Sequence, residues 1–287
     1  MFFAQGGDRM GENRHNPDQL LKAIQADEEN RNKGHLKIFF GYAAGVGKTY
    51  AMLEAAHMAK QQGIDVVAGY VEPHACPKTA ALLNGLEVLP TREVFYNGMI
   101  LDEFDIGMAL KRKPQLILVD ELAHTNAEGC RHAKRYQDIK ELLNAGIDVY
   151  TTVNVQHIES LCDTVASITE IVVRERIPDS IFDNADQVEL IDIEPQDLIN
   201  RLNTGNVYRQ TQAKQAVENF FTIENLTALR EISLRRCADR VNILTENTRI
   251  KNHGDYHTGE HILVCLSSSP SNAKIIRTAA KMASAFK

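Results

Sequence analysis

Lys48 and Thr49 follow a turn of small residues, and side chains of these types at this spacing could bind phosphate together with Mg²⁺. In a phosphate-binding loop (P-loop), backbone N–H groups and the N-terminus of the next helix surround the phosphates. The lysine reaches the outer phosphates, and the hydroxyl holds Mg²⁺. The residues that this interpretation assigns to a nucleotide are Ala43, Ala44, Gly45, Val46, Gly47, Lys48 and Thr49.

The loop departs from the usual pattern G-x-x-x-x-G-K-[ST] at its first position. Counted back from Gly47, that position holds Tyr42, and Gly41 stands one residue too early. Two alternatives therefore stay open, namely a glycine-rich turn that binds nothing and a nucleotide-free interaction module. Acidic residues further along the chain bear on this choice.

An acidic pair, Asp120 and Glu121, comes directly after the apolar segment 116–119. Four apolar residues in a row are typical of a central parallel strand that is covered on both faces. We expect Asp120 to hold Mg²⁺, directly or through water, and Glu121 to polarise an attacking water as a catalytic residue. A solvated turn is the alternative, and the presence of both motifs in the order usual for P-loop proteins disfavours it.

The segment after the acidic pair is basic, and loops at the carboxyl end of a parallel sheet surround the ligand. His124 or Asn126 could sense the outermost phosphate, and Arg131 or Arg135 could stabilise charge on it. The alternative is a solvated basic loop that leads into a helical turn.

The strand that follows ends in polar residues. Thr152 and Asn154 could position water or phosphate beside the acidic strand. Asn154 is also a good N-cap for a helix from 155, and both interpretations stay open.

Three histidines near the end, His253, His257 and His261, have the spacing of zinc ligands on a helix. Glycines at 254 and 259 disfavour a helix there, and no cysteine is nearby. We therefore predict a linker and no zinc site.

These residues need a scaffold, and from about 35 to 175 strand-like segments alternate with helical patterns, which predicts a parallel sheet. The expected strands are 36–41, 65–71, 116–120, 147–152 and 169–173. The expected helices are 49–61, 102–112, 132–145 and 155–164. Gly63 and Gly146 follow two of these helices and would end them.

After about 176 helical patterns dominate. One further strand is expected at 188–192, and helices are expected at 196–203, 209–219 and 223–246. The predicted fold class is α/β: a P-loop NTPase-like parallel sheet with helices on both faces, a helical C-terminal extension and the start of a second α/β unit. The expected parts are a polar segment at 1–33, a P-loop nucleotide-binding domain with its extension at 34–250, a linker at 251–260 and a partial α/β unit at 261–287.

Composition narrows the function classes. The 287 residues carry a formal net charge of −6, which gives no general basic surface and disfavours nucleic-acid binding. No apolar run reaches the roughly 18 residues of a membrane span. The five cysteines are scattered without a CxxC pair, which fits reduced thiols and a cytoplasmic location.

Several longer stretches carry a family resemblance. They are 37–53 around the glycine-rich loop, 69–72 (GYVE), 119–126 (VDELAHTN), 134–138 (KRYQD), 145–161 (AGIDVYTTVNVQHIESL) and 229–236 (LREISLRR). With them the chain resembles the N-terminal cytoplasmic region of the KdpD family of potassium-responsive sensor histidine kinases. The segment from about 260 resembles the opening of a universal-stress-protein-like domain.

The resemblance implies binding of ATP and Mg²⁺, since Lys48, Thr49, Asp120 and Glu121 match the family's nucleotide site. It implies a regulatory role in signalling for a high-affinity potassium uptake system, with at most slow hydrolysis. The implied partners are the rest of a sensor kinase, a potassium-uptake protein or a response regulator, and full-length relatives are anchored in the inner membrane. The chain departs from the family at Tyr42 and at 73–76, which read PHAC.

Several alternatives stay open at this point. Phosphoryl transfer to a serine of a partner would use the same Mg²⁺-phosphate cradle as hydrolysis. The sequence does not decide between a fragment and a naturally short protein. It also leaves open the sensed signal, the oligomeric state and binding of a cyclic dinucleotide to the C-terminal unit.

Overall fold

A computed structural model describes residues 33–72, 77–96, 98–203, 220–252 and 275. Its main sheet has six strands in the order β3-β2-β6-β7-β1-β8, and all neighbouring strands run parallel. They are β1 (Leu36–Gly41), β2 (Val66–Tyr70), β3 (Glu87–Val88), β6 (Leu116–Val119), β7 (Asp148–Asn154) and β8 (Gln187–Leu190). The α/β class and the parallel sheet that the sequence predicts are confirmed.

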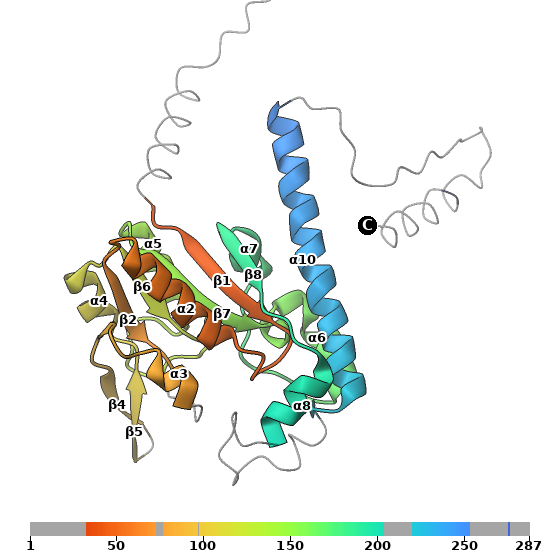
Figure 1. The fold of residues 1–287 in the computed structure, drawn as a ribbon, viewed down its shortest axis with the longest axis horizontal. Helices are drawn as coiled ribbons and strands as arrows, with labels where there is room; N and C mark the ends of the chain where they lie inside the picture. The colour runs from red at the N-terminus through yellow and green to blue at the C-terminus, as the bar shows by residue number, and fades with distance from the viewer. Residues whose placement is uncertain (1–32, 73–76, 97, 204–219, 253–274, 276–287) are drawn as a thin grey trace, which may run out of the picture.

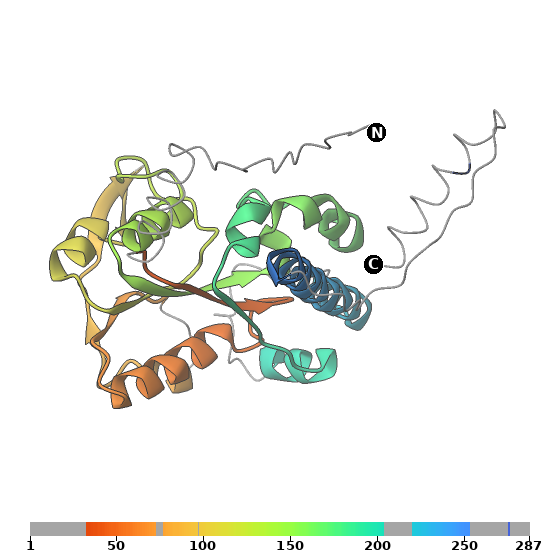
Figure 2. The same ribbon diagram turned by 90° about the horizontal axis from the view of Figure 1, so that it is seen from above.

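Helices cover both faces of this sheet, as Figure 2 shows. One face carries α2 (Lys48–Gln61) and α3 (Pro77–Ala81), and the other carries α5 (Arg135–Asn144), α6 (Cys162–Thr169) and α7 (Asp179–Asp183). The alternation of side chains along β1 explains both layers. Phe39 packs in one core with Met52 and Leu53 of α2, whereas Ile38 and Phe40 belong to the larger core on the opposite face.

A helical extension packs beside the β8 edge of the sheet (Figure 1). It consists of α8 (Pro195–Asn203) and the long helix α10 (Ile223–Asn252). Leu226 and Leu229 of α10 are buried in the larger core. Arg236 adds an ion pair of 2.6 Å to Asp183 and lies 4.8 Å from the centre of the Phe182 ring. These contacts make the extension part of the same folded body.

A short hairpin outside the main sheet is not predicted by the sequence. β4 (Arg92–Tyr96) pairs antiparallel with β5 (Met99–Glu103), and α4 (Ile106–Arg112) follows. The expected helix at 102–112 is therefore wrong at its start. The Asp105 side chain accepts a hydrogen bond from the Met108 backbone at 2.9 Å, so Asp105 caps α4 and the preceding residues stay extended.

Two other expected elements also differ. The expected strand at 169–173 is absent, because Thr169 ends α6 and β8 occupies the position beside β1. Val172 is 71% exposed, so its apolar side chain does not mark a buried strand. The expected helix at 155–164 is instead two single 3₁₀ turns, η1 (Val155–His157) and η2 (Glu159–Leu161), followed by α6.

The other expected elements in the described residues are confirmed, with ends that shift by a few residues. β7 and α10 extend past their expected ends, and α5 begins three residues late. Gly63 and Gly146 have φ angles of 86° and 78°, so they end α2 and α5 in the left-handed conformation that glycine favours.

Several predictions lie outside the described residues: the segment 1–32, the helix at 209–219, the three histidines, and almost all of the linker and the C-terminal unit. The expected domain boundaries stay predictions. Among the described helices, none is long and apolar enough to cross a membrane.

Candidate functional site

The carboxyl ends of three adjacent strands bring the predicted motifs together. Gly41 at the end of β1 pairs with Asn154 at the end of β7, and β6 lies on the other side of β7. Because parallel strands end at the same edge, the glycine-rich loop after β1 meets Asp120 after β6. Thr49 Oγ1 donates a hydrogen bond of 3.0 Å to Asp120 Oδ2 and so joins the two motifs directly.

The loop has the backbone that its sequence suggests. Gly45 and Gly47 have φ angles of 86° and 110°, in the left-handed region where other residues are strained. A Cβ atom on Gly41 would stand 2.7 Å from Val46 Cγ2, so glycine is required one position before Tyr42. Gly47 caps α2, whose first residue is Lys48. The N-terminus of α2 therefore faces the loop with the positive end of its helix dipole.

Lys48 is buried below this loop. Its Nζ donates a hydrogen bond of 3.0 Å to the Ala43 carbonyl, which closes the loop over the lysine stem. Burial lowers the Lys48 pKa to about 8, although the negative charges of Asp120 and Glu121 act in the opposite direction. A cation held in this way is stabilised by an anion, because burial penalises its charged form.

The oxygens around Asp120 suit a divalent cation. Asp120 is buried, and it accepts hydrogen bonds from Thr49 and from the Thr152 hydroxyl. Carboxylate and hydroxyl oxygens are the ligands that Mg²⁺ takes in P-loop sites, usually with water and phosphate oxygens completing the shell. Thr49 and Asp120 would hold the ion, and Thr152 fixes the carboxylate in place.

Glu121 has an unusual backbone conformation. Its φ of 59° is in the left-handed region, which is rare for a residue with a side chain and is concentrated at functional sites. Its backbone N–H donates to Asp120 Oδ1 at 3.1 Å and to Thr152 Oγ1 at 3.3 Å. The side chain reaches solvent, yet the crowded site desolvates it, and the Asp120 and Glu72 charges add to that effect and raise its pKa. A carboxylate with a raised pKa is a better proton acceptor.

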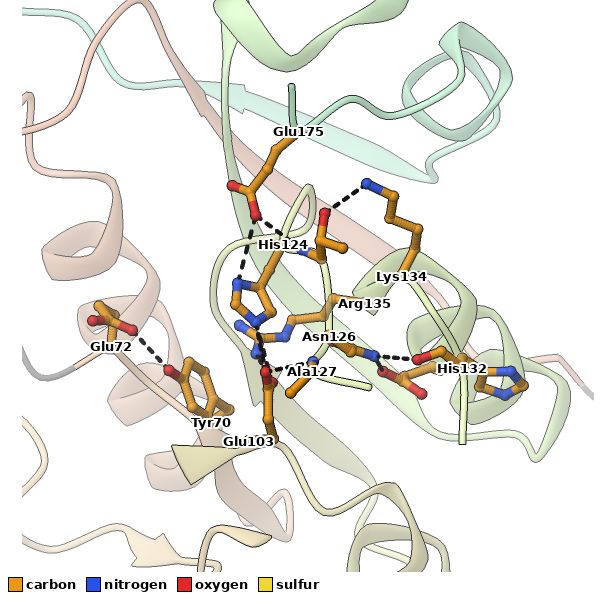
Figure 3. A network of polar contacts seen from close by, with 12 residues as sticks. Tyr70, Glu72, Glu103, His124, Asn126, Ala127, His132, Lys134, Arg135 and Glu175 are labelled. Carbon is orange, nitrogen blue, oxygen red and sulfur yellow. Dashed lines mark hydrogen bonds and ion pairs between the residues drawn. The ribbon is translucent and has the colours of Figure 1, made fainter. Parts of the chain in front are cut away.

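Glu72 belongs to the same acidic edge and is not among the predicted site residues. It follows β2, and the Tyr70 hydroxyl donates to its Oε2 at 2.8 Å (Figure 3). The signal was present in the sequence, because Glu72 follows a buried apolar strand just as Asp120 does.

Arg135 is fully buried and lies beside Glu103 (Figure 3). It donates to Glu103 Oε2 at 3.1 Å and to the Asp120 carbonyl at 3.3 Å, and its guanidinium lies 4.1 Å from the centre of the Tyr70 ring. The arginine predicted to act on phosphate thus connects β6, β5 and β2 inside the protein.

His124 also faces Glu103. Its Nε2 lies 3.1 Å from both Glu103 carboxylate oxygens, and its Nδ1 lies 3.8 Å from Glu175 (Figure 3). Burial acts to raise the pKa of Glu103, but the hydrogen bonds from His124 and the Ala127 N–H and the positive charge of Arg135 outweigh it, so this pKa is lowered. His124 therefore holds the loop after β6 to the hairpin.

Asn126 and Arg131 hold the same loop to α5. Asn126 Nδ2 donates to Asp138 Oδ2 at 2.6 Å and to the His132 carbonyl at 3.0 Å. Arg131 forms an ion pair of 2.5 Å with Glu141, and His132 Nε2 lies 2.8 Å from the same carboxylate. Each of these predicted sensor residues therefore has a partner in the fold.

Asn154 lies at the end of β7, beside the glycine-rich loop. It precedes η1, but its side chain makes no capping hydrogen bond, so the capping interpretation is wrong. Asn154 Oδ1 and Gln156 Oε1 are buried acceptors without a hydrogen-bond donor among the described residues. Such groups are costly to leave unpaired, and a bound water or ligand would satisfy them.

The sequence also missed a contact between the loop and the helical extension. Arg201 of α8 donates from Nη1 to the Val46 carbonyl at 3.5 Å, and the Tyr42 hydroxyl donates to the Ile193 carbonyl at 3.1 Å. No local pattern connects residues so far apart in the chain.

Comparison with known proteins gives a consistent result. The family model described as "KdpD: Osmosensitive K+ channel His kinase sensor domain" matches residues 32–241. The "Sensor protein KdpD" of Clostridium acetobutylicum is 58% identical over 276 residues, which cover 95% of this chain and 31% of that relative. The "Sensor protein KdpD" of Escherichia coli K12 is 51% identical over 276 residues, covering 94% of this chain and 30% of that relative.

The match covers a larger share of a shorter relative. The "Putative sensor protein KdpD" of Synechocystis is 47% identical over 252 residues, which are 88% of this chain and 68% of that relative. By contrast, the chain spans less than a third of the length of the Clostridium and Escherichia relatives.

Proposed function

The chain belongs to the KdpD sensor-domain family, and from this premise we propose that it is the regulatory, ATP-binding part of a potassium-responsive two-component sensor kinase. Nucleotide binds at the P-loop with Mg²⁺, and hydrolysis is slow at most. The partners are the remainder of the kinase, its response regulator or a potassium-uptake protein.

One observation carries the nucleotide part of this proposal: a buried lysine with a lowered pKa lies beside a hydroxyl and a carboxylate at the carboxyl edge of a parallel sheet. In such a site the helix N-terminus and loop N–H groups bind phosphate oxygens, and Lys48 neutralises the outer phosphates. Thr49 and Asp120 hold the ion, which shields phosphate charge when it is bound. These features also support the P-loop NTPase-like class within the α/β fold.

The test is nucleotide titration of the full chain by calorimetry. Lys48→Ala is expected to weaken ATP binding at least about tenfold, or ~1.4 kcal/mol. Lys140→Ala, on the exposed side of α5, is the matched control and should bind as the unmodified chain does. Equal affinities for the Lys48 variant and the unmodified chain would contradict the proposal.

The metal assignment has its own test. Asp120→Asn keeps the size of the side chain but removes the charge that the ion needs. It should abolish the gain in ATP affinity that Mg²⁺ produces, while binding without Mg²⁺ changes little. An unchanged Mg²⁺ dependence would assign the ion to other residues.

Phosphoryl transfer to a protein hydroxyl is the second candidate, and the solvent-facing position of Glu121 supports it, because a partner can reach this carboxylate as water can. In either reaction Glu121 accepts a proton from the attacking oxygen. Glu121→Gln should leave ATP binding intact and reduce turnover. Following labelled phosphate into free phosphate or into protein distinguishes the two reactions.

A further inference from the structure

The helix α8 lies beside the loop that joins β1 to α2 in both ribbon views (Figures 1 and 2). Arg201, near the end of α8, donates from Nη1 to the Val46 carbonyl at 3.5 Å. The same Nη1 stands 3.7 Å from the point where a Cβ of Gly47 would be. The guanidinium therefore lies against the loop residues that directly precede Lys48.

Tyr42 holds the segment before α8 against this loop. The tyrosine is fully buried, and its hydroxyl donates to the Ile193 carbonyl at 3.1 Å. Burial, with the Asp192 charge adding to it, raises the Tyr42 pKa to about 12, so the hydroxyl stays a donor at neutral pH. A glycine, the usual residue at this position of the pattern, would lack both the ring and the donor.

The same segment is fixed to α10 from the other side. Arg230 forms hydrogen-bonded ion pairs with Asp192 and Glu194, with distances of 2.7 to 3.0 Å. Leu198 of α8 is fully buried in the larger core. The backbone that carries Arg201 is thus held at three points, and only its long side chain needs to move to reach a ligand in the loop.

The electrostatics of the site call for another cation. Lys48 is the buried cation of the loop, but the negative charges of Asp120 and Glu121 offset its positive charge. The Glu72 carboxylate adds further negative charge at the same edge of the sheet. A nucleoside triphosphate with one Mg²⁺ keeps a net negative charge, and phosphate sites therefore commonly combine a lysine with an arginine. The guanidinium supplies several donors in a fixed plane, and this geometry suits phosphate oxygens.

We propose that Arg201 is a second phosphate-binding cation of this loop, supplied by the helical extension, and that Tyr42 is the residue that positions it. The proposal rests on the nucleotide binding proposed above. It explains the departure at Tyr42 from the usual loop pattern as an attachment between the loop and the extension. It also gives the extension a direct contact with bound phosphate, and hence a route by which nucleotide affects α8 and α10.

The experiment compares variants of the full chain by calorimetric titration with ATP at two salt concentrations. Arg201→Gln should weaken ATP binding about tenfold and reduce the salt dependence of the affinity, because one ionic contact is lost. Arg201→Lys keeps the charge without the planar donors and should recover part of that loss. Arg235→Gln removes an exposed arginine of α10 that pairs with Glu231, and it should bind as the unmodified chain does.

Tyr42→Phe keeps the buried ring and removes the hydroxyl. It should weaken ATP binding about threefold. In the Tyr42→Phe background, Arg201→Gln should then reduce the ATP affinity by a smaller factor than it does in the unmodified chain, because the two residues act together. Additive effects of the two changes would overturn the positioning role of Tyr42.

The outcomes separate this inference from the one beneath it. If the unmodified chain binds no ATP, or if Lys48→Ala has no effect, the nucleotide proposal itself fails. If the chain binds ATP through Lys48 while Arg201→Gln binds equally well, only the assignment of Arg201 fails. The assignment is also overturned if Arg201→Gln lowers the melting temperature of the ligand-free chain and leaves the salt dependence unchanged, since that pattern means a structural role.

Discussion

Lys48 and Arg135 are both buried at the carboxyl edge of the same sheet, but the fold treats their charges differently. Arg135 has Glu103 at 3.1 Å, the Asp120 carbonyl at 3.3 Å and the Tyr70 ring against its face. Lys48 donates to the Ala43 carbonyl and has no carboxylate within ion-pair distance among the described residues, and its pKa is lowered to about 8. The charge of Arg135 is compensated inside the protein, and that of Lys48 is compensated only in part.

This difference separates a structural cation from a binding cation. Burying a charge is costly unless a partner and hydrogen bonds satisfy it. Arg135 meets this condition and connects three strands, so a ligand has little to offer it. Lys48 meets it only partly, so a phosphate in the loop would stabilise the charged form. The predictions below test this comparison from the largest effect to the smallest.

Replacing Arg135, the structural cation, should produce the largest change in the free energy of unfolding. Arg135→Met is expected to lower the free energy of unfolding by about 3–5 kcal/mol, because the buried Glu103 would lose its arginine partner and keep only His124 and the Ala127 N–H beside it. Urea unfolding measures this, with Arg131→Met as control, since Arg131 pairs with Glu141 at the surface and should change stability by less than about 1 kcal/mol. Similar small losses for both variants would remove the distinction.

Replacing Lys48 should change the free energy of unfolding in the opposite direction. Lys48→Met is expected to raise the free energy of unfolding of the ligand-free chain by about 2 kcal/mol at pH 7, because the cost of burying the cation disappears while its apolar stem is retained. The same variant should lose ATP affinity. A loss of stability on this substitution would show that the fold already satisfies the lysine.

The pH dependence sharpens the same point. The folded-state pKa of Lys48 lies at about 8, below the ordinary value of 10.5, so between these values the unfolded chain binds more protons. Stability of the unmodified chain relative to Lys48→Met should therefore rise with pH in that window, by at most about 1.4 kcal/mol per pH unit. The stability cost of burying the Lys48 charge is fully present below pH 8. Unfolding curves at pH 7, 8.5 and 10 measure it, and a constant difference would contradict the lowered pKa.

The smallest effect concerns the basic stretch after the acidic pair. Arg131 is exposed but paired with Glu141, and Arg135 is fully buried. Because these cations are held by partners in the fold, protease cleavage after Arg131 should proceed at rates within about twofold with ATP–Mg²⁺ and with ADP. Markedly slower cleavage with ATP–Mg²⁺ would support the earlier interpretation of this stretch as a phosphate sensor.

Local patterns in the sequence determine much of the scaffold and the heart of the candidate site. Apolar runs predict β1, β2, β6 and β7, and glycine positions mark the turns of the loop and the ends of α2 and α5. Since parallel strands end at one edge, the spacing alone also places Lys48 near Asp120. These features depend on residues adjacent in the chain, where side-chain periodicity and backbone preference act directly.

Other features depend on which distant segments meet, and only the tertiary structure decides them. The apolar residues near 171 look like a strand, but β8 takes the place beside β1. Arg135 looks like a phosphate ligand until Glu103, 32 residues earlier, occupies it. Arg201 gives no local signal, because its contact with Val46 spans 155 residues. A sequence shows which residues carry charge, but the environment of each charge is set by packing, and that environment determines whether the charge holds the fold together or remains for a ligand.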